Sequence, residues 1–477
     1  MNRTQLLKHA RFLILCLLML LSLTGCWDKV ELESRGFVVS IGVDRFEPGD
    51  KESHNNPDAS SDKKSLNKTE DKEEDKEEEE KEEEEEKCEE EYEEKKSKDG
   101  EEEEENTPNN LLKNRNENDQ QTKKAEKEAG DSEKAVSIGF TDGKPMDSRF
   151  TVTMALPNLG AIVGNGGEDK TKSIKMADDK TIAGAINIAN VHSSQKLYFG
   201  QAKNCIFGED ILRDSELFKE ALDSLERNQD ISRTLIILGT SARAEEILKT
   251  DVTGEPLVGM FISNFYKNNA SAAAVTFPLN LERLISDLRA TGNAILPRIE
   301  TAGSEVKLSG AAIIRDFSLA GWMNDQQTRG YLWYFGKGKG AELITEYNHV
   351  PVPLRVSEQK SKVTFAEENG RIIVFVNIRA EGSAEEYTLM HDTTLSQEDV
   401  LKELEKRYAQ LIANELLSTE NLFQKKYAMD GFGLLDSLRK QNNNLYLKYK
   451  DQWDDAIANM EMVPIVSVTI RNTGSIK

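Results

Sequence analysis

The chain contains 477 residues, enough for two or three domains with a sizeable hydrophobic core. Its net charge of −23 is unevenly distributed, because residues 70–105 hold 25 acidic and 7 basic side chains and the rest of the chain carries only −5. The acidity therefore belongs to one segment. It argues against nucleic acid as a partner of that segment, because like charges repel.

The first residues have the features of an export signal rather than of a helix in the mature fold. A basic start precedes an apolar run at residues 12–23, which is short for a membrane span. The sequence LTGC at residues 23–26 resembles the bacterial lipobox. This resemblance implies that residues 1–25 are removed as a signal peptide and that Cys26 carries a diacylglyceryl thioether. The alternative is an uncleaved anchor with a chance cysteine. Acyl chains, at roughly 0.8 kcal/mol per buried methylene, would hold the mature protein on the membrane.

The other cysteines and the histidines predict no further site. Cys88 lies in the acidic tract and Cys205 in an apolar run, so we expect folding by burial of apolar surface rather than by a disulfide. No C-x-x-C or H-E-x-x-H spacing is present, and the histidines are scattered. No metal, cofactor or catalytic residue is predicted.

Residues 48–134 contain hardly any apolar side chain. They cannot bury enough surface to offset the entropy of ordering, so we expect a disordered acidic insert. Strand patterns at residues 36–44 and 149–156 flank it, which predicts a loop between early strands of one sheet. Such a loop costs on the order of 2–3 kcal/mol, because closure entropy grows only logarithmically with length. The insert has the charge density to collect cations weakly, and an inert solvated spacer is the alternative interpretation.

Helical and β patterns alternate from residue 135 to about residue 250. Helices are expected at residues 181–190, 211–227 and 242–248, strands at residues 197–200, 204–208 and 233–239, and a polar, glycine-rich loop at residues 160–179. The alternation predicts an N-terminal α/β domain formed by residues 26–47 and 135–250.

A middle domain at residues 251–305 and a C-terminal α+β domain at residues 306–477 are expected to follow. The middle domain contains helical patterns at 259–268 and 279–289 and a strand at 294–299. The C-terminal domain is predicted to contain strands at 306–314 and 318–322, a helix or turn at 326–335, an antiparallel meander of strands at 350–358, 361–366 and 372–381, a long helix at 397–426, helix or loop at 436–453 and a closing strand at 463–470. The predicted fold class is mixed α/β (α+β) and multi-domain, with β-sheets flanked by helices.

Chemistry-bearing motifs are sparse. The sequence GKGKG at residues 336–340 is basic and glycine-rich enough to cradle a phosphate, but it lacks the strand–loop–helix lysine signature, which favours a flexible turn. No G-x-S-x-G is present. Trp322, Tyr331, Trp333 and Tyr334 could form a contact surface, although core packing is favoured for each of them. The residues therefore predict a tethered, non-enzymatic protein outside the membrane.

A series of motifs resembles the Ger(x)C family of spore germination lipoproteins. The motifs are GCWD at residues 25–28 with EL at 31–32, GVD at 42–44, SSQKLYFG at 193–200, GAAI at 310–313, GW at 321–322, TRGYLW at 328–333, DGFG at 430–433 and Trp453. Together they cover nearly the whole mature chain apart from residues 48–134. This sequence departs from the family at two places: Gln201 stands where the family commonly has histidine, and the acidic insert has no family counterpart.

This resemblance implies that the protein is the C subunit of a nutrient germinant receptor. It would be lipid-anchored through Cys26 on the outer face of the spore inner membrane, and it would assemble with the membrane-embedded A and B subunits. It also implies a three-domain mixed α/β fold. Only Cys26 matches a functional position of the family.

Two functions of other classes remain open. A solute-binding lipoprotein of a transport system would also be exported and anchored, and a cell-envelope hydrolase would need a catalytic constellation that the sequence does not suggest. The identity of the neighbouring genes distinguishes the receptor subunit from the solute-binding lipoprotein. Genes for two multi-span receptor subunits favour the receptor, whereas a gene for a transporter permease favours solute binding.

Overall fold

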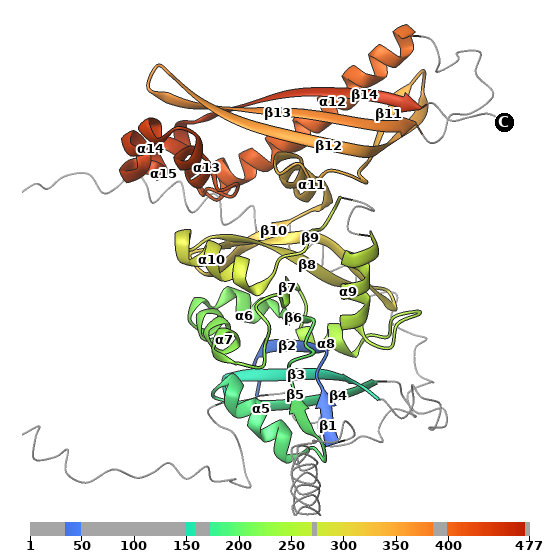
Figure 1. Ribbon diagram of the computed structural model, residues 1–477, viewed down its shortest axis with the longest axis vertical. Coiled ribbons are helices and arrows are strands. Elements are labelled where there is room, and N and C mark those ends of the chain that lie inside the picture. The colour runs from blue at the N-terminus through green and yellow to red at the C-terminus, as the bar shows by residue number, and fades with distance from the viewer. Residues whose placement is uncertain (1–33, 49–147, 159–171, 270–273, 385–397, 473–477) are drawn as a thin grey trace, which may run out of the picture. The chain divides into compact units, whose positions relative to one another are not determined.

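The computed structural model describes residues 34–48, 148–158, 172–269, 274–384 and 398–472. The described strands form sheets of two, eight and four strands with helices packed against them (Figure 1). This confirms the predicted mixed α/β (α+β) class. The expected signal peptide and nearly all of the acidic insert lie outside the described residues.

The eight-stranded sheet has the order β10-β9-β8-β7-β6-β2-β3-β4. Its strands are β2 (Ser40–Arg45), β3 (Phe150–Pro157), β4 (Lys172–Asp179), β6 (Asn204–Phe207), β7 (Ile236–Gly239), β8 (Ala294–Ala302), β9 (Glu305–Arg315) and β10 (Ser318–Met323). The central strands β2, β6, β7 and β8 run parallel, and antiparallel strands extend the sheet on both sides. Parallel strands at the centre of a sheet are buried on both faces, which explains why their sequences are continuous apolar runs.

Helices cover both faces of this sheet. They are α5 (Ile182–Val191), α6 (Glu209–Arg213), α7 (Ser215–Arg227), α8 (Ala244–Lys249), α9 (Val258–Asn269) and α10 (Leu281–Thr291). On β6, Cys205 and Phe207 belong to the same core as α7 and α10, whereas Ile206 belongs to the core formed with α8 and α9. The predicted helix at residues 211–227 is divided, because Asp214 ends α6 and its carboxylate caps the start of α7.

A two-stranded parallel sheet lies at the start of the described chain. It pairs β1 (Arg35–Phe37) with β5 (Lys196–Tyr198). A Cβ at Gly36 would approach a side-chain carbon of Leu156 to 2.8 Å, so β1 packs closely on the eight-stranded sheet. The first described strand is therefore held in a defined place.

The four-stranded sheet has the order β11-β12-β13-β14. It consists of β11 (Glu342–Tyr347), β12 (Val350–Glu368), β13 (Arg371–Ala384) and β14 (Glu461–Asn472). The helical segments of this part are α11 (Asp325–Tyr334), α12 (Glu398–Asn421), the π-helix η4 (Leu422–Lys426), α13 (Leu434–Gln441), α14 (Asn443–Tyr449), the 3₁₀-helix η5 (Lys450–Gln452) and α15 (Trp453–Asn459). The buried hydroxyl of Tyr408 on α12 donates to the carbonyl of Val352 on β12 at 2.7 Å, which fixes the long helix on the sheet.

The structure corrects two sequence predictions and adds one strand. The predicted loop at residues 160–179 contains strand β4, which is paired with β3 along its whole length. The strands expected at residues 350–358 and 361–366 form a single strand, β12, with a bulge between Val356 and Glu358. Strand β11 was not predicted. These strands are half-exposed or irregular, so their sequences lack a strong apolar pattern.

The insert connects neighbouring strands. β2 and β3 pair antiparallel from Ser40↔Ala155 to Arg45↔Phe150, which confirms that residues 48–134 lie in a connection within one sheet. The boundary expected at residue 305 falls in the hairpin between β8 and β9 of the same sheet.

Among the described residues, no helix combines the length and the apolar character needed to cross a membrane.

Candidate functional site

Cys26, the functional position that the sequence predicts, lies outside the described residues. Several of the motif residues that are described lie at two places. The first is the edge of the eight-stranded sheet where its parallel strands end, and the second is the junction of α11 with α12 and α13. A surface groove between α7 and α10 is a third candidate.

The carboxyl ends of parallel strands are where open α/β sheets usually bind ligands. Here Asp44, the last residue of the GVD motif on β2, lies at that edge and is 2% exposed. Its carboxylate accepts hydrogen bonds from the backbone N–H groups of Ala244 at 2.7 Å and Glu245 at 3.0 Å. These groups belong to the first turn of α8 and have no partner within the helix. Asp44 therefore caps α8 from a strand 200 residues earlier in the chain.

The surroundings of Asp44 are equally tight. A Cβ at Gly208, which follows β6, would approach the Oδ1 atom of Asp44 to 2.1 Å. Burial raises the pKa of Asp44 to about 6, although its backbone hydrogen bonds and the nearby Arg243 guanidinium lower it. The usual position of a ligand is thus filled by a side chain of the protein. The motif was visible in the sequence, but its helix-capping role was not, because α8 follows so much later.

The TRGYLW motif lies on α11 and faces α12. Arg329 and Trp333 are four residues apart, so they lie on one face of the helix. The Nε atom of Arg329 donates to Oε2 of Glu415 on α12 at 2.9 Å, and Nε1 of Trp333 donates to the same oxygen at 2.7 Å. Glu415 is 3% exposed. A Cβ at Gly330 would come within 2.3 Å of the Glu415 carbonyl oxygen, so this glycine permits the close approach of the two helices.

The DGFG motif completes the same junction. The carboxylate of the half-buried Asp430 accepts hydrogen bonds from the N–H groups of Leu434 at 2.8 Å and Leu435 at 2.9 Å, at the start of α13. The indole N–H of Trp453 donates to it at 3.3 Å. Burial raises the pKa of Asp430, and these hydrogen bonds lower it. The ring of Phe432 lies 4.5 Å from that of Tyr334, centroid to centroid.

The aromatic residues that the sequence singled out belong mostly to this core. Trp333 is fully buried and Tyr334 is 4% exposed, which confirms core packing for both. Tyr331 is half-buried and lies 5.3 Å from the Phe277 ring. The half-buried Trp322 lies beneath the Arg298 guanidinium at 5.4 Å. These four aromatic side chains therefore hold elements together rather than forming an open contact surface.

The GKGKG segment forms an ordered turn. Its backbone N–H groups are already used: Lys337 donates to the Leu332 carbonyl at 2.9 Å, Gly338 to Oε1 of Gln359 at 2.9 Å, and Gly340 to the Val356 carbonyl at 2.8 Å. A phosphate cradle needs such groups to point toward the ligand. The segment therefore holds β12 against α11, and its arrangement does not suit phosphate binding.

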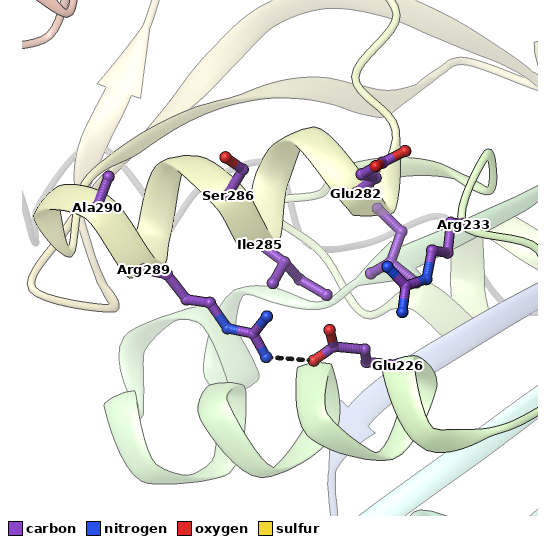
Figure 2. A pocket seen from close by; sticks show the side chains of 8 residues that line it. Glu226, Arg233, Glu282, Ile285, Ser286, Arg289 and Ala290 are labelled. Carbon is purple, nitrogen blue, oxygen red and sulfur yellow. Dashed lines mark hydrogen bonds and ion pairs between the residues drawn. The ribbon is translucent and has the colours of Figure 1, made fainter. Parts of the chain in front are cut away.

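The groove between α7 and α10 has a volume of about 430 Å³. It is lined by Glu226, Arg233, Leu281, Glu282, Ile285, Ser286, Arg289 and Ala290. Figure 2 shows the carboxylate of Glu226 joined to the guanidinium of Arg289, and their atoms lie 2.5 Å apart. The lining includes the hydroxyl of Ser286 but no histidine that could act as its general base. The described residues also contain no group of three His, Cys, Asp or Glu that could hold a metal ion.

Comparison with known proteins identifies the origin of these motifs. The family model of the spore germination protein N-terminal domain matches residues 133–301, and that of the spore germination B3/GerAC-like C-terminal domain matches residues 309–474. Together these matches span well over half of the chain.

Curated relatives and a solved structure agree with the family models. The putative spore germination protein YfkR of Bacillus subtilis is 26% identical over 71% of this chain and 90% of its own length. The spore germination protein YndF of the same organism is 24% identical over 59% of this chain and 70% of its own length. The crystal structure of the GerBC protein, 18% identical, aligns with a TM-score of 0.50 over 68% of this chain and 94% of that chain, which shows a shared fold. The chain thus belongs to the Ger(x)C family of spore germination proteins.

Proposed function

We propose that this protein is the lipid-anchored C subunit of a spore nutrient germinant receptor. It works on the outer face of the spore inner membrane by contacts with membrane-embedded A and B subunits. The observation that carries the proposal is the match of both halves of the chain to spore germination domains. The relatives that it matches over most of their own lengths are named as spore germination proteins.

The lipid anchor is supported by the LTGC sequence at residues 23–26 after an apolar run. An acylated Cys26 would lie nine positions before Arg35, the first residue of β1. Because β1 packs closely on the eight-stranded sheet, the tether would hold the folded chain near the bilayer rather than let it diffuse away.

A coupling role without catalysis is supported by the way in which buried and half-buried carboxylates are used. Asp44, Glu415 and Asp430 bind backbone or side-chain donors that hold helices in place. Such groups stabilise a rigid body that transmits contacts. Within the described residues they lie beside no activated nucleophile. We also propose a disordered insert at residues 48–134; the domain boundaries that the sequence suggests at residues 250 and 305 both fall between paired strands of the eight-stranded sheet.

The test is dipicolinate release from spores that lack the gene, complemented with the wild-type protein or with Cys26→Ala. We expect loss of the response to particular nutrients, restored by the wild-type form and not by the variant, because only Cys26 can be acylated. A normal response of the deletion spores to every nutrient would contradict the receptor role and favour a solute-binding lipoprotein. Incorporation of a palmitate analogue into the Cys26→Ala protein would contradict the lipid anchor.

A further inference from the structure

We propose that the outer face of α5, together with the adjoining β1–β5 sheet, rests on the surface of a bilayer that contains anionic lipids and so orients the anchored chain. The inference rests on the proposed acylation of Cys26, and it adds a second, non-covalent membrane contact. We call this surface the α5 face. It comprises Ala183, Asn187, Val191, Arg35 and Lys196.

α5 has an unusual composition for a helix on the outside of a domain. Its sequence, IAGAINIANV, contains no charged residue, whereas such helices normally carry charges on their outer face. Ile182, Ala185 and Ala189 point inward and are buried. On the outer side, Val191 is 62% exposed. Ala183 and Asn187 are spaced at four-residue intervals before it and are also exposed, so the outer stripe is uncharged along its whole length.

Basic and aromatic groups adjoin the C-terminal end of this stripe. The backbone N–H of Leu197 on β5 donates to the side chain of Asn190 at 2.8 Å, which joins α5 to the two-stranded sheet (Figure 1). Arg35 and the exposed Lys196 are register partners in that sheet. The Arg35 guanidinium lies 5.0 Å from the Tyr198 ring. Basic and aromatic side chains of this kind favour the headgroup level of a bilayer, and basic groups favour anionic lipids.

The acidic groups near α5 lie at its other end. Asp179 accepts hydrogen bonds from Thr181, which caps the N-terminus of the helix. The N-terminal end of α5 therefore adjoins two carboxylates, Asp178 and Asp179, and one exposed cation, Lys180, whereas the C-terminal end adjoins the basic Arg35 and Lys196. On an anionic surface this difference in charge favours the orientation with Val191 and Lys196 toward the lipid.

The length of the tether selects the bilayer as the occupant. Arg35 lies nine residues after Cys26, so a fully extended connection spans at most about 30 Å. An acylated Cys26 thus keeps β1, and α5 beside it, close to the membrane at all times. A weak contact is then sufficient, because tethering makes it intramolecular.

The experiment measures lipid contact at single positions of the full chain, exported and acylated in a bacterial host. A Cys88→Ser background removes one reactive thiol, and Cys205 is buried. Val191→Cys is labelled with a nitrobenzoxadiazole dye. The matched control is Ile465→Cys on β14, where the native side chain is 50% exposed. Both proteins are reconstituted into vesicles of equal parts phosphatidylcholine and phosphatidylglycerol, with or without a nitroxide-labelled lipid.

We expect about twofold stronger nitroxide quenching at position 191 than at position 465, together with a blue-shifted emission at position 191. Lys196→Glu in the Val191→Cys protein should reduce the quenching, because it replaces a cation of the α5 face by an anion that the anionic lipids repel. Equal quenching at the two positions would overturn the inference.

A palmitate analogue incorporated into the same preparations distinguishes this failure from failure of the proposed function. Incorporation with equal quenching contradicts only the α5 contact. Absence of incorporation contradicts the lipid anchor and, with it, the inference.

Discussion

Two buried carboxylates, one beside each of the two larger sheets, have their negative charge stabilised by different kinds of hydrogen-bond donor. Asp44, at the edge of the eight-stranded sheet, receives its hydrogen bonds from backbone N–H groups of α8. Glu415, beside the four-stranded sheet, receives them from the side chains of Arg329 and Trp333. The two are almost equally buried, at 2% and 3% exposure. Burial alone therefore does not determine how a charge contributes to the fold; the kind of partner does.

The difference has consequences for each region. Backbone N–H donors are present whatever the neighbouring side chains are. The contribution of Asp44 to stability therefore depends on the position of α8 and on whether the Asp44 carboxyl group is protonated. Glu415 depends on two particular side chains, and removal of either partner leaves polar groups unpaired in the interior. One region should therefore respond mainly to pH and the other mainly to substitution.

The largest effect is expected for Glu415→Leu. The substitution leaves the Arg329 guanidinium, 19% exposed, and the Trp333 N–H without their acceptor. We expect a loss of about 3–5 kcal/mol in the free energy of unfolding, measured by urea denaturation. Glu403→Gln on the same helix is the control, because its ion pair with Arg407 is exposed and should contribute less than about 1 kcal/mol. Equal effects of the two substitutions would contradict the assignment.

A double substitution sharpens this result. Arg329→Met combined with Glu415→Leu replaces the buried ion pair by apolar groups, which is often nearly neutral. The double variant should recover much of the stability lost by Glu415→Leu, although the Trp333 N–H stays without its partner. A double variant less stable than either single variant would show that the ion pair is not the main cause.

The second prediction is a pH dependence at Asp44. Its pKa is about 6 in the folded chain and 3.8 ordinarily, so the folded state binds the proton more tightly. Ionisation of Asp44 therefore opposes folding, and its contribution to stability improves as the pH falls from about 6 to about 4, by about 3 kcal/mol. Denaturation of the wild type and Asp44→Asn across this range isolates the effect, because other groups cancel in the difference. Parallel stability curves would be incompatible with a raised pKa.

The third prediction concerns the turn that packs on the α11–α12 junction. In Gly338→Ala the new Cβ would come within 1.9 Å of a ring carbon of Trp333, which is fully buried. We expect a loss of about 1–3 kcal/mol from overpacking and a change in tryptophan fluorescence. Lys339→Ala, at the exposed neighbouring position, should change stability by about 0.5 kcal/mol or less. A stable Gly338→Ala protein would mean that the ring can move.

The smallest effect is expected for deletion of residues 55–134. The deletion makes the connection between β2 and β3 about fourfold shorter. Because a shorter loop loses less entropy when its ends are brought together, the fold should be stabilised by about 1 kcal/mol. The register from Ser40↔Ala155 to Arg45↔Phe150 supplies the pairing without the insert. Thermal unfolding of the shortened chain measures this. A clear fall in melting temperature would show that the insert packs on the fold.

Sequence patterns predicted the elements that bury a complete apolar face. The helix α7 buries Leu217, Phe218, Ala221, Leu222 and Leu225 at helical spacing, and β6 is buried throughout. Local periodicity is sufficient in such cases, because the same residues determine both the element and the face that it buries. The strand patterns that flank residues 48–134 are local in the same way, and they predicted that the insert connects two strands of one sheet.

The strands β4 and β11 show where local patterns fail. β4 has one buried residue among eight, and its pairing with β3 decides its conformation. Gln359 interrupts the apolar alternation of β12, but it is buried because its side chain bonds the backbone of Gly338 and Trp333. A buried polar residue interrupts the apolar pattern of a strand without ending the strand when its side chain finds hydrogen-bond partners.

By itself the sequence determined the fold class and the family motifs, because these depend on composition, periodicity and short contiguous patterns. The acylation of Cys26 stays a prediction from the resemblance of residues 23–26 to the lipobox. Only the tertiary structure decided what the motif residues do. The capping of α8 by Asp44 joins positions 200 residues apart, and the bond from Trp333 to Glu415 joins positions 82 residues apart. No local pattern encodes such pairs, because their energy depends on the burial and the geometry that the folded chain creates.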